Sequence, residues 1–255
     1  SFRFKVCFSK FLYLSGPIVM SALRSAAIPV SDPSAGLRIT EIFYSLQGEA
    51  NAAGLATVFI RLTGCPLRCH YCDTTYSFEG GERQSLAQIV QTALDYKTPY
   101  ICVTGGEPLA QPNALPLMTR LADLGCQISL ETSGALDVSK VDPRVSKVLD
   151  LKTPSSGEQK RNLMSNLDYL TQHDQIKFVI CNREDYEWSK AQVSQYALDQ
   201  LVSTVWFSPA FAVEKGAVAL PALARDLAQW ILEDHLPVRF QLQLHKLLWN
   251  DETGR

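Results

Sequence analysis

Runs of apolar residues and stretches of helical periodicity alternate along this chain from Leu37 onward. Strand-like apolar runs occur near residues 38–44, 56–62, 99–103, 127–131, 146–151, 175–180, 203–207 and 238–243. Amphipathic helical patterns occupy residues 85–95, 113–124, 184–199 and 219–234 between them. This alternation predicts a parallel sheet with helices packed outside it.

The first 36 residues depart from this pattern. They carry four basic side chains and one acidic side chain, namely Arg3, Lys5, Lys10, Arg24 and Asp32. We interpret residues 1–19 as an upstream extension, because Met20 begins a segment typical of a natural start, and residues 21–36 as a loosely ordered tail. A targeting peptide is the alternative. We therefore expect an N-terminal extension over residues 1–36 and one domain over residues 37–255.

Composition and charge are consistent with a soluble enzyme and say little more. The chain has 255 residues, enough for a sizeable core, and a net charge of −2, so it lacks the basic field expected of a nucleic-acid binder. No apolar run reaches the length that spans a bilayer. Four isolated cysteines lie in apolar contexts and indicate a reducing compartment, the cytoplasm. They are Cys7, Cys102, Cys126 and Cys181.

Three cysteines in one short loop carry the clearest chemical signal. Cys65, Cys69 and Cys72 have the spacing Cys-x3-Cys-x2-Cys and follow the strand-like run 56–62. Clustered thiolates suit zinc or an iron–sulfur cluster, and three of them leave one iron of a cubane cluster open. A structural zinc site completed by His70 is the alternative, although this residue lies between two ligands and would strain the loop.

A second motif lies about forty residues downstream. The segment Val103-Thr104-Gly105-Gly106-Glu107-Pro108 closes a predicted strand, and its glycines permit close approach of the backbone to a ligand. Together the cysteine loop and this segment resemble the radical S-adenosylmethionine (SAM) superfamily.

Within that superfamily the chain resembles the 7-carboxy-7-deazaguanine synthases over roughly residues 37–250. The resemblance rests on several separated segments, which are residues 41–49, 59–65, 72–74, 131–134, 150–154, 176–179 and 243–246. It implies an incomplete TIM-like barrel with fewer covering helices than a full barrel. The motifs lie at predicted carboxyl ends of strands, where ligands of such folds bind.

The resemblance also implies the cofactors and the residues that bind them. A [4Fe–4S] cluster would be held by Cys65, Cys69 and Cys72. SAM would contact a set of polar and glycine residues at strand ends, namely Gly105, Gly106, Glu107, Ser133 and Lys152. A magnesium ion would be bound by Thr74, with Asp73 in a supporting place; an Asx turn is the plain alternative there.

The implied substrate is 6-carboxy-5,6,7,8-tetrahydropterin, which has an aminopyrimidinone edge and a carboxylate. Gln47 and Glu49 can pair with the edge, and the planar fork of Arg61 can hold the carboxylate. Thr104 and His245 complete the predicted substrate contacts, with His245 reaching in from the last strand. In some relatives the C-terminal carboxylate touches substrate, and the longer tail 247–255 puts that contact in doubt.

The implied reaction is that of a carbon–nitrogen lyase in queuosine precursor biosynthesis, with loss of ammonia. Flavodoxin or ferredoxin as electron donor and a homodimer are further expectations, with no direct nucleic-acid or membrane partner. Two alternatives stay open: another radical SAM enzyme, such as a glycyl-radical activase, and a structural zinc-binding module.

Overall fold

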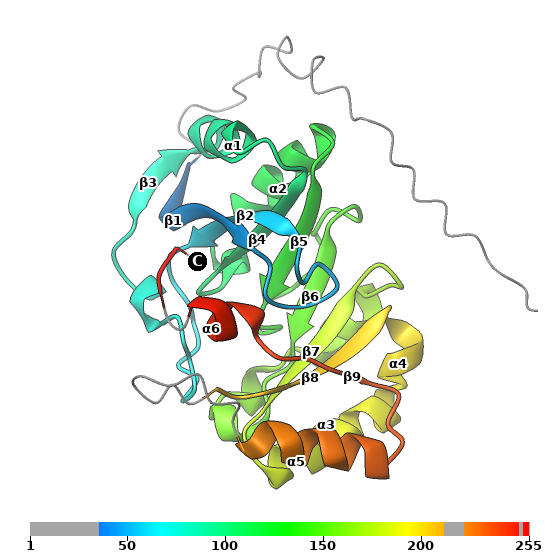
Figure 1. The fold of residues 1–255 in the computed structure, drawn as a ribbon. Helices are drawn as coiled ribbons and strands as arrows, with labels where there is room; N and C mark the ends of the chain where they lie inside the picture. Colours follow the sequence, from blue (N-terminus) through cyan, green and yellow to red (C-terminus); the bar gives the residue numbers. More distant parts are fainter. Residues whose placement is uncertain (1–35, 212–221, 250–251, 255) are drawn as a thin grey trace, which may run out of the picture.

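The computed structural model describes residues 36–211, 222–249 and 252–254, so most of the expected N-terminal extension lies outside the described residues. Within this part of the chain, nine strands form one open sheet in the order β3-β1-β2-β4-β5-β6-β7-β8-β9 (Figure 1). Their bounds are β1 Gly36–Leu46, β2 Ala56–Leu62, β3 Glu82–Ser85, β4 Tyr100–Gly105, β5 Gln127–Thr132, β6 Ser146–Asp150, β7 Gln175–Ile180, β8 Thr204–Pro209 and β9 Arg239–Phe240.

The sheet is parallel from β2 to β9, as the alternating pattern predicts, but its first edge is antiparallel. The strands β1 and β2 form a hairpin, and β3 pairs antiparallel with the outer side of β1. The connection of residues 47–55 between β1 and β2 is too short for the crossover that parallel strands require. The result is an open, mostly parallel barrel of the incomplete TIM type.

Helices cover the outside of the sheet unevenly. Their bounds are α1 Leu86–Asp95, α2 Ala114–Asp123, α3 Arg183–Tyr196, α4 Leu198–Leu201, α5 Ala222–Glu233 and α6 Leu244–Trp249. The connections after β5 and β6 contain turns and 3-10 helices only, so the cover is reduced there. Shorter 3-10 helices are η2 Thr75–Ser77, η3 Pro108–Ala110, η4 Pro154–Ser156, η5 Gln159–Arg161 and η6 Met164–Tyr169.

Two predicted elements differ from those observed, and a third is described only in part. The expected helix 184–199 is interrupted at Ala197, whose left-handed φ of 47° ends α3 and starts α4. The last strand spans only Arg239–Phe240, and the prediction that His245 lies on a strand is wrong, because residues 244–249 form α6. The start of the expected helix 219–234 lies outside the described residues.

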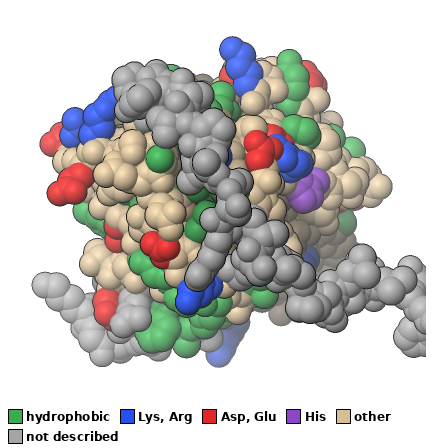
Figure 2. All heavy atoms as spheres, turned by 90° about the horizontal axis from the view of Figure 1, so that it is seen from above, with side chains coloured by type: hydrophobic (Ala, Val, Ile, Leu, Met, Phe, Trp, Pro, Cys, Tyr) green, Lys and Arg blue, Asp and Glu red, His purple; other side chains and the backbone are tan. Residues whose placement is uncertain are grey.

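The apolar core lies between the sheet and the helices. Val58, Ile60 and Leu62 of β2 are fully buried, and so are Phe178 of β7 and Phe207 of β8, whose rings meet edge to face. Among the described residues no helix is long and apolar enough to cross a membrane. On the face drawn in Figure 2, basic and acidic side chains of the described residues are interspersed, in keeping with the small net charge.

The connection 47–55 reaches across the interior to the far strands of the sheet. The amide of Ala50 donates to Gln241 Oε1 at 2.5 Å, and the amide of Asn51 donates to Gln175 Oε1 at 2.8 Å. The same Gln175 oxygen accepts from Trp206 Nε1 at 2.9 Å. These bonds fix the connection against β7 and β8. They thereby hold Gln47 and Glu49, at the start of the connection, inside the barrel.

We expect Gln175→Leu to destabilise the protein, because it leaves the buried indole N–H of Trp206 and the part-buried amide of Asn51 without their acceptor. Each such donor costs about 1–3 kcal/mol. The exposed Gln229→Leu is the control and should change the free energy of unfolding by less than about 0.5 kcal/mol. Denaturant unfolding measures both, and equal losses in the two variants would contradict the anchoring role of Gln175.

Candidate active site

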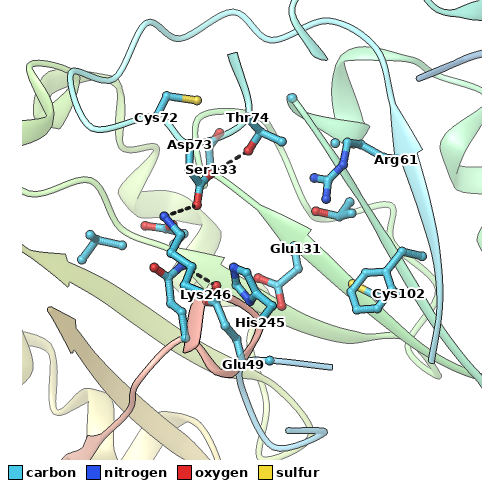
Figure 3. A pocket seen from close by; sticks show the side chains of 18 of the residues that line it. Glu49, Arg61, Cys72, Asp73, Thr74, Cys102, Glu131, Ser133, His245 and Lys246 are labelled. Carbon is cyan, nitrogen blue, oxygen red and sulfur yellow. Dashed lines mark hydrogen bonds and ion pairs between the residues drawn. The ribbon is translucent and has the colours of Figure 1, made fainter. Parts of the chain in front are cut away.

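One cavity opens at the carboxyl ends of the strands. It is lined by all but one of the site residues predicted from the sequence. They are Gln47, Glu49, Arg61, Cys65, Cys69, Cys72, Thr74, Thr104, Gly105, Gly106, Ser133, Lys152 and His245. Several of these side chains point into the same space in the close-up view (Figure 3). The residue that does not line the cavity is Glu107.

The loop with the three cysteines continues directly from the end of β2. Its backbone is attached to η4, since the amide of His70 donates to the carbonyl of Ser156 at 3.1 Å. The three cysteines are free, partly exposed and line the cavity. Burial raises the pKa of Cys65 and raises that of Cys69 to about 11, so binding of a metal cluster must displace thiol protons.

Two glycines let the end of β4 approach the cysteine loop. Gly105 has a φ of +149°, and a Cβ there would lie 2.3 Å from the carbonyl oxygen of Leu62. A Cβ on Gly106 would lie 2.8 Å from Cys65 Cβ and 2.3 Å from the carbonyl oxygen of Gly64. A larger residue at Gly105 would push the end of β2 away from β4, and one at Gly106 would push the cysteine loop away.

Glu107 is fully buried behind the cavity wall. Its carboxylate accepts hydrogen bonds from the amide and hydroxyl of Ser133, from the hydroxyl of Thr132 and from the amide of Leu109. The carboxylate therefore fixes Ser133 at the end of β5. The prediction that it contacts SAM directly gains no support from this position, although the adjacent Gly105 and Gly106 do line the cavity.

Lys177, a residue that sequence reasoning missed, lies at the centre of a buried group of charges. Its ammonium lies 2.7 Å from Glu49 Oε2, 3.6 Å from Asp150 Oδ2 and 3.8 Å from Glu131 Oε2. Burial alone would raise the pKa of Glu49, but Lys177 lowers it to about 2. Gln243 also donates to Glu49 Oε1 at 2.7 Å, so this carboxylate is ionised and rigidly held.

Glu131 and Asp150 were also missed as site residues. Each has one buried oxygen, Glu131 Oε1 and Asp150 Oδ1, without a hydrogen-bond partner, and both residues line the cavity. Burial, followed by repulsion from Glu49 and Asp150, raises the pKa of Glu131 to about 7, although Lys177 opposes the shift. A carboxylate near the carboxyl end of a predicted parallel strand was the signal that could have identified them.

Arg61 is aimed into the cavity by Glu41, its direct partner in the β1–β2 ladder. Arg61 Nε lies 2.6 Å from Glu41 Oε1, and the hydroxyl of Tyr76 donates to the same oxygen at 2.8 Å. The guanidinium also lies 5.8 Å from the ring centre of Phe43. These contacts hold Nε, and the two terminal nitrogens remain available for a planar anion.

Thr74 and His245 face the cavity from opposite walls. The hydroxyl of Thr74 donates to Asp73 Oδ1 at 2.7 Å, so its oxygen lone pairs are available to a cation. Burial lowers the pKa of His245, opposed by Glu49 and Asp73. Among the described residues no three His, Cys, Asp or Glu side chains meet the geometry of a single-ion site.

Comparison with known proteins defines the class first. The radical SAM superfamily profile matches residues 59–152, which include the cysteine loop and the Gly105-Gly106 segment. The fold is similar to that of QueE from Escherichia coli, with a TM-score of 0.66 and 22% identity over 82% of this chain and 94% of that one. The protein is a radical SAM protein with an incomplete barrel.

The sequence relatives narrow this class to one family. The chain is 43% identical to the 7-carboxy-7-deazaguanine synthase of Koribacter versatilis, over 85% of this chain and 99% of the relative. It is 40% identical to the enzyme of the same name from Chlorobaculum tepidum, over 86% and 97%. The chain belongs to the 7-carboxy-7-deazaguanine synthase family.

The raised pKa of Glu131 predicts a pH-dependent effect of Glu131→Gln. Between about pH 4.5 and 7 the unfolded chain gives up a proton that folded Glu131 keeps, so this group's contribution to stability falls as pH rises. We therefore compare the difference in melting temperature, variant minus parent, at two pH values. We expect this difference to be more positive at pH 8 than at pH 5. Calorimetry on cluster-free protein measures it, with the exposed Glu233→Gln as control. A pH-independent difference for Glu131→Gln would contradict the shift.

Proposed function

We propose that this protein converts 6-carboxy-5,6,7,8-tetrahydropterin into 7-carboxy-7-deazaguanine and ammonia, as a lyase in queuosine precursor biosynthesis. The single observation that supports this most is the convergence of the family's motifs, from separated segments, on one cavity. Product and ammonia together contain the atoms and electrons of the substrate. The reaction therefore needs no net oxidant, and SAM would be regenerated in each turnover.

Cys65, Cys69 and Cys72 would hold a [4Fe–4S] cluster, because they are free thiols that line one wall of the cavity. When bound there, the cluster and SAM supply a 5′-deoxyadenosyl radical for hydrogen abstraction. Gly105 and Gly106 leave room for SAM beside the cysteine loop. Ser133, fixed by Glu107, and Lys152, paired with Asp150 at 3.1 Å, are the further proposed SAM contacts.

The pterin would lie between the hairpin and α6. At its aminopyrimidinone edge the amide of Gln47 would donate and accept hydrogen bonds and the ionised Glu49 would accept them, with Thr104 and His245 as neighbours. Arg61 would clamp the substrate carboxylate with its two terminal nitrogens. Glu131, which keeps a proton up to about pH 7, has an unpartnered oxygen that can donate to or accept from the substrate.

Magnesium would bind the substrate carboxylate and Thr74. The donor set fits this ion, because the threonine oxygen offers lone pairs and Mg²⁺ often uses one or two protein oxygens plus substrate and water. The ion would supply charge neutralisation at the carboxylate. Asp73 would orient Thr74 by accepting the hydrogen bond of its hydroxyl.

The wider setting follows from the family resemblance. We infer a cytoplasmic homodimer that receives electrons from flavodoxin or ferredoxin and has no direct nucleic-acid or membrane partner. The catalytic domain would span residues 37–255, with residues 1–36 as an extension.

The deciding experiment is an anaerobic assay with reconstituted cluster, SAM, reductant, Mg²⁺ and 6-carboxytetrahydropterin, followed by mass spectrometry. We expect 7-carboxy-7-deazaguanine, with many turnovers per SAM consumed. Cys72→Ala should abolish turnover and lower bound iron, because one thiolate ligand is lost. Cys126→Ala is the matched control, since this free cysteine does not line the cavity.

Each other outcome removes a part of the proposal. SAM cleavage without deazaguanine would keep the radical SAM class and reject the substrate, which favours another radical SAM enzyme. Full iron content without SAM cleavage would reject the radical chemistry. Zinc in place of iron and sulfide after anaerobic purification would favour a zinc-binding module.

Arg61→Lys tests the carboxylate clamp. A lysine lacks the planar fork and cannot contact Glu41 and a substrate carboxylate together, so we expect KM for the pterin to rise about 10-fold or more. The effect on kcat should be smaller. Arg239→Lys is the control, because Arg239 stacks on Trp206 and does not line the cavity. An unchanged KM for Arg61→Lys would show that the carboxylate binds elsewhere.

A further inference from the structure

Helix α6 is held on the protein by a buried charge. Lys246 is the only buried residue of α6, with its side chain 8% exposed, while the neighbouring Leu248 is 51% exposed. A short helix that docks on a protein surface normally buries apolar side chains. Here the buried side chain is an ammonium group, which requires a partner of opposite charge.

The partner is Asp73, the residue that follows the last cysteine of the loop. Lys246 Nζ lies 3.1 Å from Asp73 Oδ2, and the other oxygen, Asp73 Oδ1, accepts the hydroxyl of Thr74 at 2.7 Å. Figure 3 shows the lysine, the aspartate and the threonine in one line along the cavity. The lysine therefore fixes one carboxylate oxygen, and the carboxylate orients the threonine hydroxyl through the other.

The opposite side of α6 is bound to the β1–β2 connection. The amide of Leu244 donates to the carbonyl of Gly48 at 3.1 Å, and Gln243, just before the helix, donates to Glu49. His245 lies between these contacts and Lys246. The helix thus joins two walls of the cavity. Its described ion pair with the cysteine-loop side is that between Lys246 and Asp73.

We propose that Lys246 is a positioning residue, which acts through Asp73 to hold α6 over the cavity and to orient the hydroxyl of Thr74 for cation binding. In this role Lys246 acts through Asp73 and not by direct contact with the reacting atoms or the metal. The helix-holding part stands on the geometry alone, whereas the cation-binding part rests on the proposed function. The two parts have separate measurements.

The first measurement is hydrogen–deuterium exchange of the α6 amides in the parent protein and in Lys246→Met, without substrate. Removal of the ammonium should increase exchange over residues 244–249, because the described ion pair between the helix and the cysteine loop is lost. The control is Lys190→Met, which breaks another Lys–Asp pair, Lys190 to Asp234 at 2.8 Å, away from the cavity. It should leave exchange in α6 unchanged.

The second measurement is the Mg²⁺ concentration that gives half-maximal turnover. Loss of a residue that supports a metal ligand typically weakens metal binding by about 10-fold or more, so we expect a shift of that size in Lys246→Met and in Asp73→Asn. The double variant should be no worse than the more impaired single variant, because both act through one contact. Lys246→Arg, which keeps the charge, should restore part of the affinity.

A merely structural role makes different predictions. It would lower iron content, the electron paramagnetic resonance signal of the reduced cluster, and substrate-independent SAM cleavage along with turnover. The proposal requires these three quantities to stay at the parent level in Lys246→Met. Their loss, unchanged exchange in α6, or an unchanged Mg²⁺ requirement would each overturn it. If the parent protein forms no deazaguanine, the proposed function fails, and the exchange comparison alone decides whether Lys246 holds α6.

Discussion

The buried ammonium group of Lys177 is the constraint on which the cavity depends. An unpaired charge inside a protein is costly, and its removal from water is offset only when carboxylates surround it. Here the carboxylates come from three places, the β1–β2 connection, β5 and β6, in the form of Glu49, Glu131 and Asp150. The interior of the barrel is polar for this reason, while the apolar core lies between the sheet and the helices.

The same charge balance divides the carboxylates into two kinds. Glu49 has the shortest contact with the ammonium and stays ionised, whereas Glu131 is more distant and keeps a proton up to about pH 7. Two glutamates in one cavity therefore differ in charge at neutral pH. A polar, planar ligand would meet an acceptor on one side and a group that can donate a proton on the other.

Sequence patterns predicted most of the sheet, since strands such as 56–62 and 175–180 have the bounds that the structure shows. The residues that the family resemblance marked, apart from Glu107, line one cavity, because motifs at the ends of parallel strands meet at one edge. The antiparallel edge and α6 were missed. In α6 the buried residue is Lys246, and periodicity cannot recognise a helix that docks through a charge. Lys177 and Glu131 were missed because their significance depends on partners distant in sequence.

The distances along the chain between contacting residues also have a consequence for folding. The hydrogen bond from Ala50 to Gln241 joins residues 191 positions apart, and that from Lys177 to Glu49 spans 128. The cysteine loop and Gly106, in contrast, lie within one β–α–β stretch. Because long loops close at a greater entropic cost, the cofactor side of the cavity can form early, and the substrate side only after the C-terminal segment arrives. A ribosome-bound chain would thus complete its cysteine loop well before it could hold a pterin.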